Sequence, residues 1–243
     1  DLKPSGRDTG LTATYEFQPL SNLVYTRDQQ VTTAGGVVMG RLRSPQRALE
    51  VDLMAFCFAK LGLPVLGGIE APGFLEGGDF FPAGPGLALL GIGLRSNMAA
   101  AHQLMSSGWL GGVHTLAVVR DEFDQAQDRM HLDCVFSLLG DDVCLMLEDM
   151  MGEASPTRRT VDEWVMDPGT GAYSLARSGV EFAAYMRGRG WHIIPVPSAD
   201  QLAYGCNCLN LGGGKVLSVH AGTARAIVRD PKFRGDVQVV DFG

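Results

Sequence analysis

The segment 87–95 reads LALLGIGLR and is the most apolar stretch of the chain. A short apolar run of this length, closed by glycine and a charged residue, is typical of a buried strand. The next segment, 97–107, has the spacing of a helix, and 115–119 is again apolar and strand-sized. Strands that alternate with helices in this way predict an α/β fold.

The same order of strand, strand, helix and strand recurs on both sides of this segment. We expect helices over 46–61, 97–107, 176–187 and 223–229. We expect strands over 37–39, 64–66, 87–93, 115–119, 134–139, 141–147, 191–197, 208–211, 215–219 and 237–241. The helix 46–61 places four apolar side chains near one face: Leu49, Leu53, Phe56 and Leu61. No Pro/Ser-rich linker divides the chain, so residues 1–243 are expected to form one α/β domain of repeated modules.

Composition excludes several classes of protein. The chain has 243 residues, of which 46% are apolar and 19% charged, so it can bury a core and is not intrinsically disordered. The net charge of −7 gives no support to a nucleic-acid partner. Since no apolar run reaches the roughly 18–20 residues of a membrane helix, we expect no membrane span.

The five cysteines show neither a disulfide framework nor paired zinc knuckles. We interpret them as reduced thiols and expect a cytoplasmic protein, with an organelle matrix as the alternative. The pair Cys206 and Cys208 has only His220 nearby, which does not favour a metal site.

Four short polar segments stand out against this apolar background. They are Asn22-Leu-Val-Tyr-Thr-Arg-Asp28, Glu76-Gly-Gly-Asp79, Gly91-Ile-Gly-Leu-Arg95 and Met130-His-Leu-Asp133. Each has an ordinary structural explanation alone: a strand-like run, a turn, a strand end, or a hydrogen-bonded pair. The two glycines between Glu76 and Asp79 allow backbone or a ligand to come close. Alternation places His131 and Asp133 on one face.

Together, in this order and spacing, the segments resemble the arginine deiminases of the guanidino-group-modifying (pentein) superfamily. The resemblance continues through Asn207-Cys-Leu-Asn-Leu-Gly-Gly-Gly-Lys-Val-Leu217 and the last helix and strand. It implies a pentein α/β-propeller of ββαβ modules around a pseudo-five-fold axis. Residues 1–21 lead into the first polar segment, so the chain would hold modules two to five and be incomplete.

The resemblance implies a role for each polar residue. Asp28 and Asp133 would grip a guanidinium, His131 would be the acid and base, and Glu76 would orient it. Asn22, Arg47, Arg95 and Asp79 would bind the remainder of the substrate. We expect Asp28, Glu76, His131 and Asp133 to converge on one pocket, with Arg47 and Arg95 at its other end.

The activity implied is hydrolysis of L-arginine to L-citrulline and ammonia through a cysteine-bound amidino intermediate, without cofactor or metal. The family's nucleophile would follow the strand 237–241, where this chain stops. Cys206 and Cys208 match a hairpin instead, and we expect them to point away from the pocket. The alternatives are a non-catalytic structural subunit and, less well matched, an amidinotransferase or a dimethylarginine hydrolase. Partners would be a small-molecule substrate and either a second copy of the chain or missing segments of the same polypeptide.

Overall fold

The computed structural model describes residues 20 and 22–240 of the chain. The residues expected to lead into the first polar segment, and the last residue of the strand expected at 237–241, therefore lie outside the described part. Within that part, none of the helices has the length and apolarity that a membrane crossing requires.

Four units repeat one order: two antiparallel strands, a helix, and a strand parallel to the second. The first unit contains β1 (Gln30–Thr33), β2 (Gly36–Met39), α1 (Ala48–Leu61) and β3 (Val65–Gly68). The second contains β4 (Phe80–Pro82), β5 (Leu87–Ile92), α2 (Met98–Ser106) and β6 (Thr115–Arg120). The third contains β7 (Phe136–Leu138), β8 (Val143–Leu147), α3 (Phe182–Gly188) and β11 (His192–Val196). The fourth contains β12 (Cys208–Gly212), β13 (Lys215–Ser218), α5 (Ala221–Arg229) and β14 (Asp236–Val239).

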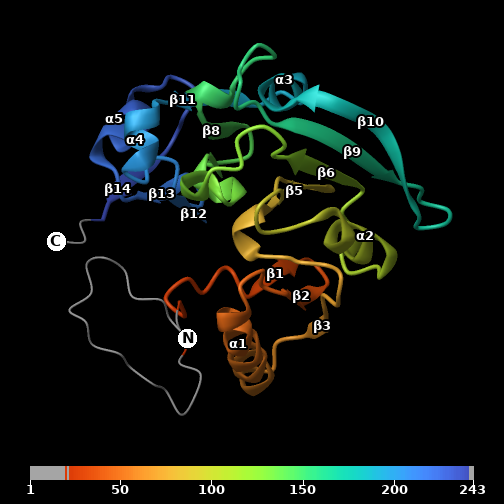
Figure 1. Cartoon of the computed structure of the whole chain (residues 1–243). Coiled ribbons are helices and arrows are strands. Elements are labelled where there is room, and N and C mark those ends of the chain that lie inside the picture. The colour runs from red at the N-terminus through yellow and green to blue at the C-terminus, as the bar shows by residue number, and fades with distance from the viewer. Residues whose placement is uncertain (1–19, 21, 241–243) are drawn as a thin grey trace, which may run out of the picture.

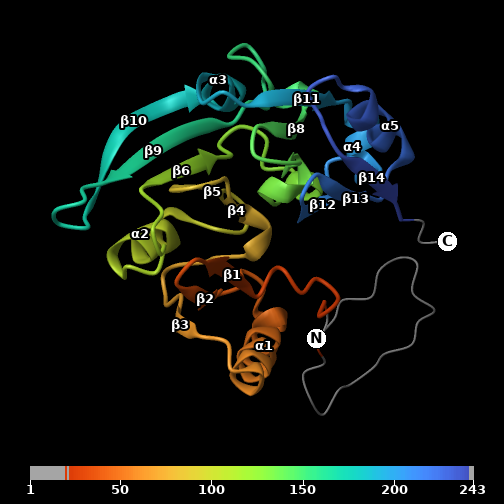
Figure 2. The same cartoon turned by 180° about the vertical axis from the view of Figure 1, so that it is seen from behind.

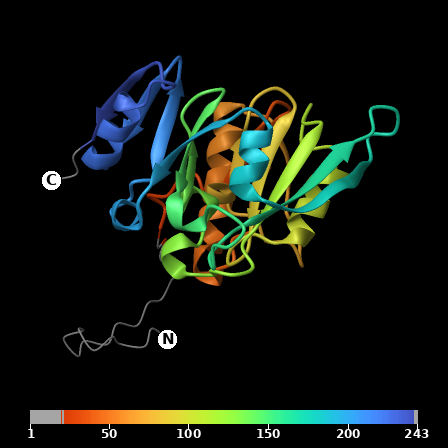
Figure 3. The same cartoon turned by 90° about the horizontal axis from the view of Figure 1, so that it is seen from above.

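The units follow one another around the molecule, from β1–β3 to β12–β14 (Figures 1 and 2). The second unit is extended by β9 (Thr160–Met166) and β10 (Tyr173–Glu181), which form a five-stranded sheet in the order β10-β9-β6-β5-β4. This hairpin projects on the side opposite to the fourth unit (Figure 3). The short helix α4 (Ser198–Leu202) lies between the third and fourth units in sequence. The repeated α/β modules expected from the sequence are thus present.

Strand β5, predicted from segment 87–95, is buried on both faces. Leu89 belongs to the core cluster that also contains Phe136 and Phe182, whereas Leu90 belongs to the cluster that contains Leu104 of α2. Neighbouring residues of a strand point to opposite faces, so one strand contributes to both clusters. The two cores hold the second unit between the first and the third and thereby fix the segments that connect them.

Two of the expected helices differ from the structure in detail. The helix expected at 46–61 is present as α1, but Leu49, Phe56 and Leu61 are exposed and Glu50 is the buried residue of this helix. The helix expected at 176–187 is shorter than expected, because its first half belongs to β10. Strand β10 pairs with β9, where Arg177 donates from Nε and Nη2 to both oxygens of Glu163, at 3.0 and 2.8 Å.

Candidate functional site

A cavity of about 850 Å³ lies where the segments between the units meet. Each of these segments comes just before the first strand of a unit, and three of them contribute to the wall: Asn22–Asp28 before β1, 127–134 before β7, and 201–207 before β12. The fourth, Glu76–Asp79 before β4, lies behind His131. The volume falls within the roughly 300–1,000 Å³ of small-molecule sites.

His131 and Glu76 form a buried pair. The two atoms Nε2 of His131 and Oε2 of Glu76 are 2.8 Å apart, although the residues are 55 positions apart in sequence. The other oxygen of Glu76 accepts from the backbone N–H of Arg43 at 2.9 Å. Both oxygens of the Glu76 carboxylate are therefore held by hydrogen bonds, and the carboxylate in turn orients the imidazole ring of His131.

The pair holds opposite charges at neutral pH. Burial alone would lower the pKa of His131, but the hydrogen bond to Glu76 and the charges of Asp79 and Asp133 raise it to about 9. Burial alone would raise the pKa of Glu76, yet the hydrogen bond and charge of His131 lower it. His131 is thus a buried imidazolium that can donate a proton into the cavity.

Asp28 faces the cavity from the turn before β1 and is held by Arg47. Nη1 of Arg47 donates to Oδ2 of Asp28 at 2.8 Å, while its Nε and Nη2 donate to Glu50 of α1 at 3.0 and 2.9 Å. Arg47 is 6% exposed and Glu50 is fully buried. Nη2 of Arg47 also reaches the backbone oxygen of Asn22 at 3.4 Å. Asn22 and Asp28 therefore share one support, although their segment forms turns rather than the expected strand.

Asp133 faces the cavity beside His131, and glycines make room for both. A Cβ at Gly78 would lie 2.9 Å from Nδ1 of His131 and 3.0 Å from Oδ2 of Asp133. A Cβ at Gly77 would lie 1.8 Å from the backbone oxygen of Arg27. The expected close approach to this glycine pair is thus confirmed. Burial raises the pKa of Asp133, and the charges of Arg27 and His131 oppose that rise.

Asp79 lies behind the cavity wall. Its carboxylate accepts from the backbone N–H of Leu132 at 2.8 Å and from the hydroxyl of Ser96 at 2.7 Å. Burial raises its pKa to about 6. Asp79 therefore holds the segment that carries His131 and Asp133, and its substrate-binding role stays a prediction.

Arg95 lines the cavity from the loop after β5. Its Nε and Nη2 lie 3.2 and 3.0 Å from the sulfur of Met130, and its Nη1 lies 4.0 Å from Oε1 of Glu76. Arg47 and Arg95 were expected at the far end of the pocket from the carboxylates. That expectation is wrong, since each lies within contact of one of them.

The cysteines are placed as follows. Cys208 begins β12 of the hairpin and Cys206 sits in the turn before it, and neither lines the cavity, as expected. Cys134 does line the cavity, and its Sγ lies 3.7 Å from Oδ1 of Asp133. Burial and the charge of Asp133 raise the pKa of Cys134 to about 12. This thiol is protonated at neutral pH and is a poor nucleophile.

Sequence reasoning missed three supporting residues: Glu50, Ser96 and Cys134. The spacing of Arg47 and Glu50 is a signal for the first, since residues three apart on a helical turn are neighbours. Ser96 directly follows Arg95 in the polar segment. Cys134 follows Asp133, but its exposure to the cavity depends on how the short 3-10 turn Leu132–Cys134 is oriented.

The arrangement combines a buried imidazolium with carboxylates that can accept hydrogen bonds from a planar cation. The family model described as "Arginine deiminase" matches residues 7–232, nearly the whole chain. The chain belongs to the arginine deiminase family. An arginine deiminase of Halobacterium salinarum is 27% identical, over 83% of this chain and 54% of that protein. One of Mycobacterium bovis is 31% identical, over 61% of this chain and 38% of that protein.

Solved structures place this family member in the pentein fold. A variant of DDAH from Pseudomonas aeruginosa complexed with citrulline is similar, with a TM-score of 0.64, 21% identity, and coverage of 90% of this chain and 69% of that chain. The N-terminal domain of an arginine dihydrolase from the cyanobacterial ornithine–ammonia cycle gives a TM-score of 0.65 at 16% identity, covering 90% and 68%. The chain spans about half the length, or less, of the curated relatives named above.

Proposed function

We propose that the protein is an arginine deiminase-type hydrolase, which converts L-arginine and water into L-citrulline and ammonia. The observation that carries this is the His131–Glu76 pair beside the carboxylates of Asp28 and Asp133 in one cavity. A guanidinium is a planar cation with N–H donors along its edges, and carboxylates accept these bonds in pairs. DDAH, which has the same fold, was crystallised with citrulline, the product proposed here.

The proposed reaction has two stages. A cysteine thiolate adds to the guanidinium carbon, and one terminal C–N bond breaks as His131 donates its proton to the departing ammonia. His131, now neutral, takes a proton from water as the water oxygen adds to the same carbon. The C–S bond then breaks and the remaining hydroxyl proton passes to solvent, which regenerates the thiolate and leaves the neutral urea group of citrulline. Glu76 holds the ring of His131 through both proton transfers.

We further propose that the thiolate comes from outside the described residues and that the four units are modules two to five of a longer polypeptide. The state of the cavity cysteine supports this, since burial keeps Cys134 protonated at neutral pH. The share of the relatives' length that the chain spans is consistent with it. The first module would then complete the wall of the cavity, and the segment that follows the fourth unit would supply the nucleophile.

The test compares this chain with the longer polypeptide that contains it. Calorimetry measures L-arginine binding, and a colorimetric assay measures citrulline. We expect the 243-residue chain to bind L-arginine weakly and to form no citrulline, whereas the longer protein forms it and its His131→Ala variant does not. Citrulline from the short chain would overturn the placement of the nucleophile.

A non-catalytic structural subunit is the competing function, and the same experiment separates the two. A longer protein that lacks a cysteine near the cavity and forms no citrulline would favour it. Three carboxylates and a histidine gathered at one cavity argue against it, since burying charged groups costs stability that a purely structural role does not require.

A further inference from the structure

Cys134 places a thiol in the cavity wall beside two other groups that can bind metals. One ligand atom each of His131, Asp133 and Cys134 lies within 4.8 Å of the other two. All three residues line the cavity, so a cation can reach them from solvent. The proposed hydrolysis uses His131 and Asp133 but gives no task to this thiol.

The hydrogen bonds around His131 leave one ring nitrogen open. Nε2 faces Glu76, whereas Nδ1 has no hydrogen-bond partner among the residues that the structure describes. Nδ1 and Oδ2 of Asp133 face the same small space above Gly78, as their distances of 2.9 and 3.0 Å from a Cβ built there indicate. A carboxylate on the far nitrogen of a histidine is the usual outer support of a zinc ligand. Glu76 stands in that position.

We propose that His131, Asp133 and Cys134 form a binding site for a zinc-class divalent cation, with its fourth position open to the cavity. An imidazole nitrogen, a carboxylate oxygen and a thiolate sulfur are the ligand types that zinc and cobalt take in proteins. Zinc–ligand lengths of about 2.0–2.3 Å put ligand atoms roughly 3.3–3.8 Å apart in a tetrahedron. Side chains within 4.8 Å of one another at a cavity surface reach that spacing by small rotations.

Charge favours the site as well. On binding, the Cys134 thiol and Nδ1 of the His131 imidazolium each release a proton to solvent, and the thiolate together with the Asp133 carboxylate balances the two positive charges of the cation. The nearby cation Arg27 has its Nε 3.9 Å from Oδ2 of Asp133, but its guanidinium donates to the backbone oxygens of Gly77 and Phe80 at 3.0 and 2.9 Å and makes no hydrogen bond to this carboxylate. The bound cation is not a participant in the proposed reaction; it occupies two of the residues that the reaction uses.

The inference goes beyond the proposed function, and its test needs no turnover. Reduced, chelator-treated protein is titrated with Co²⁺ and followed by absorption. We expect one equivalent to bind with the near-ultraviolet band of a cobalt–thiolate bond and the strong visible bands of four-coordinate cobalt. Zn²⁺ should displace it. In Cys134→Ser the thiolate band disappears and affinity falls by more than about tenfold, the loss that even an outer-shell change can cause.

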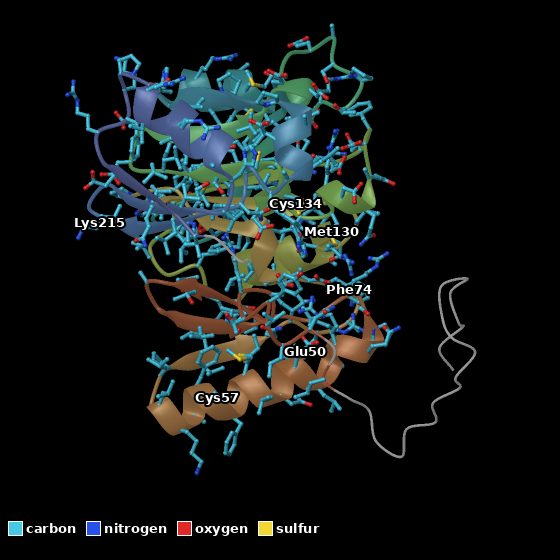
Figure 4. The ribbon with its side chains drawn as sticks, turned by 90° about the vertical axis from the view of Figure 1, so that its left-hand side faces the viewer. Glu50, Cys57, Phe74, Met130, Cys134 and Lys215 are labelled. Carbon is cyan, nitrogen blue, oxygen red and sulfur yellow. The ribbon has the colours of Figure 1, made fainter. Side chains whose placement is uncertain are left out.

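Matched variants of two other cysteines serve as controls. Cys57, on α1, is far from Cys134 (Figure 4), and Cys57→Ser and Cys208→Ser should both keep the band. Asp133→Asn should weaken Co²⁺ binding but should retain the cobalt–thiolate band, because Cys134 is unchanged. X-ray absorption at the zinc edge of the unaltered protein, expected to give one sulfur at about 2.3 Å, avoids any effect of the variants on folding. A band that survives in Cys134→Ser, a band lost in Cys208→Ser, or a zinc site without sulfur would overturn the inference.

Discussion

Arg47 donates to Asp28 from Nη1 at 2.8 Å while the rest of its guanidinium is held by Glu50. Four of its five N–H donors are used by Asp28, Glu50 and the backbone of Asn22. Arg47, which the resemblance assigned to binding the remainder of the substrate, thus orients the aspartate proposed for the guanidinium. One N–H of Nη1 has no acceptor among residues 20 and 22–240 and can donate to a ligand.

Removing Arg47 should therefore cost stability as well as binding. Arg47→Met leaves two buried carboxylates without their cation, and we expect a loss of about 3–5 kcal/mol in the free energy of unfolding, measured with urea. Arg47→Lys should recover only part of it, because an ammonium cannot bridge both carboxylates as a guanidinium does. Arg43→Met is the control, since Arg43 is exposed and its guanidinium packs on Phe74. Equal losses in the two methionine variants would contradict the role given to Arg47.

His131 should make stability depend on pH in the alkaline range. Its pKa in the folded protein is raised to about 9, so the stabilisation is complete below its ordinary value near 6.5 and is lost as pH rises through 9. Over that window we expect a decline on the order of 3 kcal/mol in the unfolding free energy. His131→Gln should remove the decline, whereas the exposed His102→Gln should keep it. If the unfolding free energy of His131→Gln still declines over this pH range, another group is responsible for the decline.

Gly78 should not tolerate even a methyl group. In Gly78→Ala the new Cβ meets His131 and Asp133 at about 3 Å, so either the side chains or the backbone must shift. We expect a destabilisation of about 1–3 kcal/mol and weaker L-arginine binding. Gly140→Ala is the matched control, because a Cβ there has no atom within 4 Å. Undisturbed binding in Gly78→Ala would mean that the ring and the carboxylate need not stay in this position.

Arg95 can be tested with two ligands that differ only in a carboxylate. If Arg95 binds the α-carboxylate, Arg95→Ala should weaken L-arginine binding and leave that of agmatine, the decarboxylated analogue, nearly unchanged. Calorimetry with both ligands measures the difference. Equal losses for the two would show that Arg95 acts instead on the guanidinium end, through its approach of 4.0 Å to Glu76.

The sequence was most informative where local pattern and tertiary position agree. Segment 87–95 predicted a buried strand, and β5 is one because both of its faces pack on a core. Segment 176–187 failed because its first half pairs with β9 through contacts such as Arg177 with Glu163, which a helical pattern does not reveal. On α1, apolar spacing predicted the helix correctly, but it does not reveal that Leu49, Phe56 and Leu61 are exposed.

The candidate site shows a similar division. The sequence identifies which residue types gather at the cavity. It also predicts that His131 and Asp133 share a side, and they do, since Leu132 between them turns into the core. Which residue forms hydrogen bonds with which does not follow from the sequence. Arg47 lies 19 residues from Asp28, and only the fold decides that it bonds to this carboxylate. The same holds for Asp79, which binds the backbone of Leu132 instead of facing the cavity.

Each functional segment lies just before the first strand of its unit. The four segments therefore occupy equivalent positions around the cavity, one from each unit. Three of the four equivalent positions carry acids: Asp28, Glu76 with Asp79, and Asp133. The fourth carries Asn207, a neutral amide whose Nδ2 donates to the backbone oxygen of Asp133 at 3.1 Å. Four structurally similar units thus surround a cavity whose charge is unevenly distributed. Its uncharged rim lies on the side of the fourth unit, where a ligand's neutral part can rest without meeting a carboxylate.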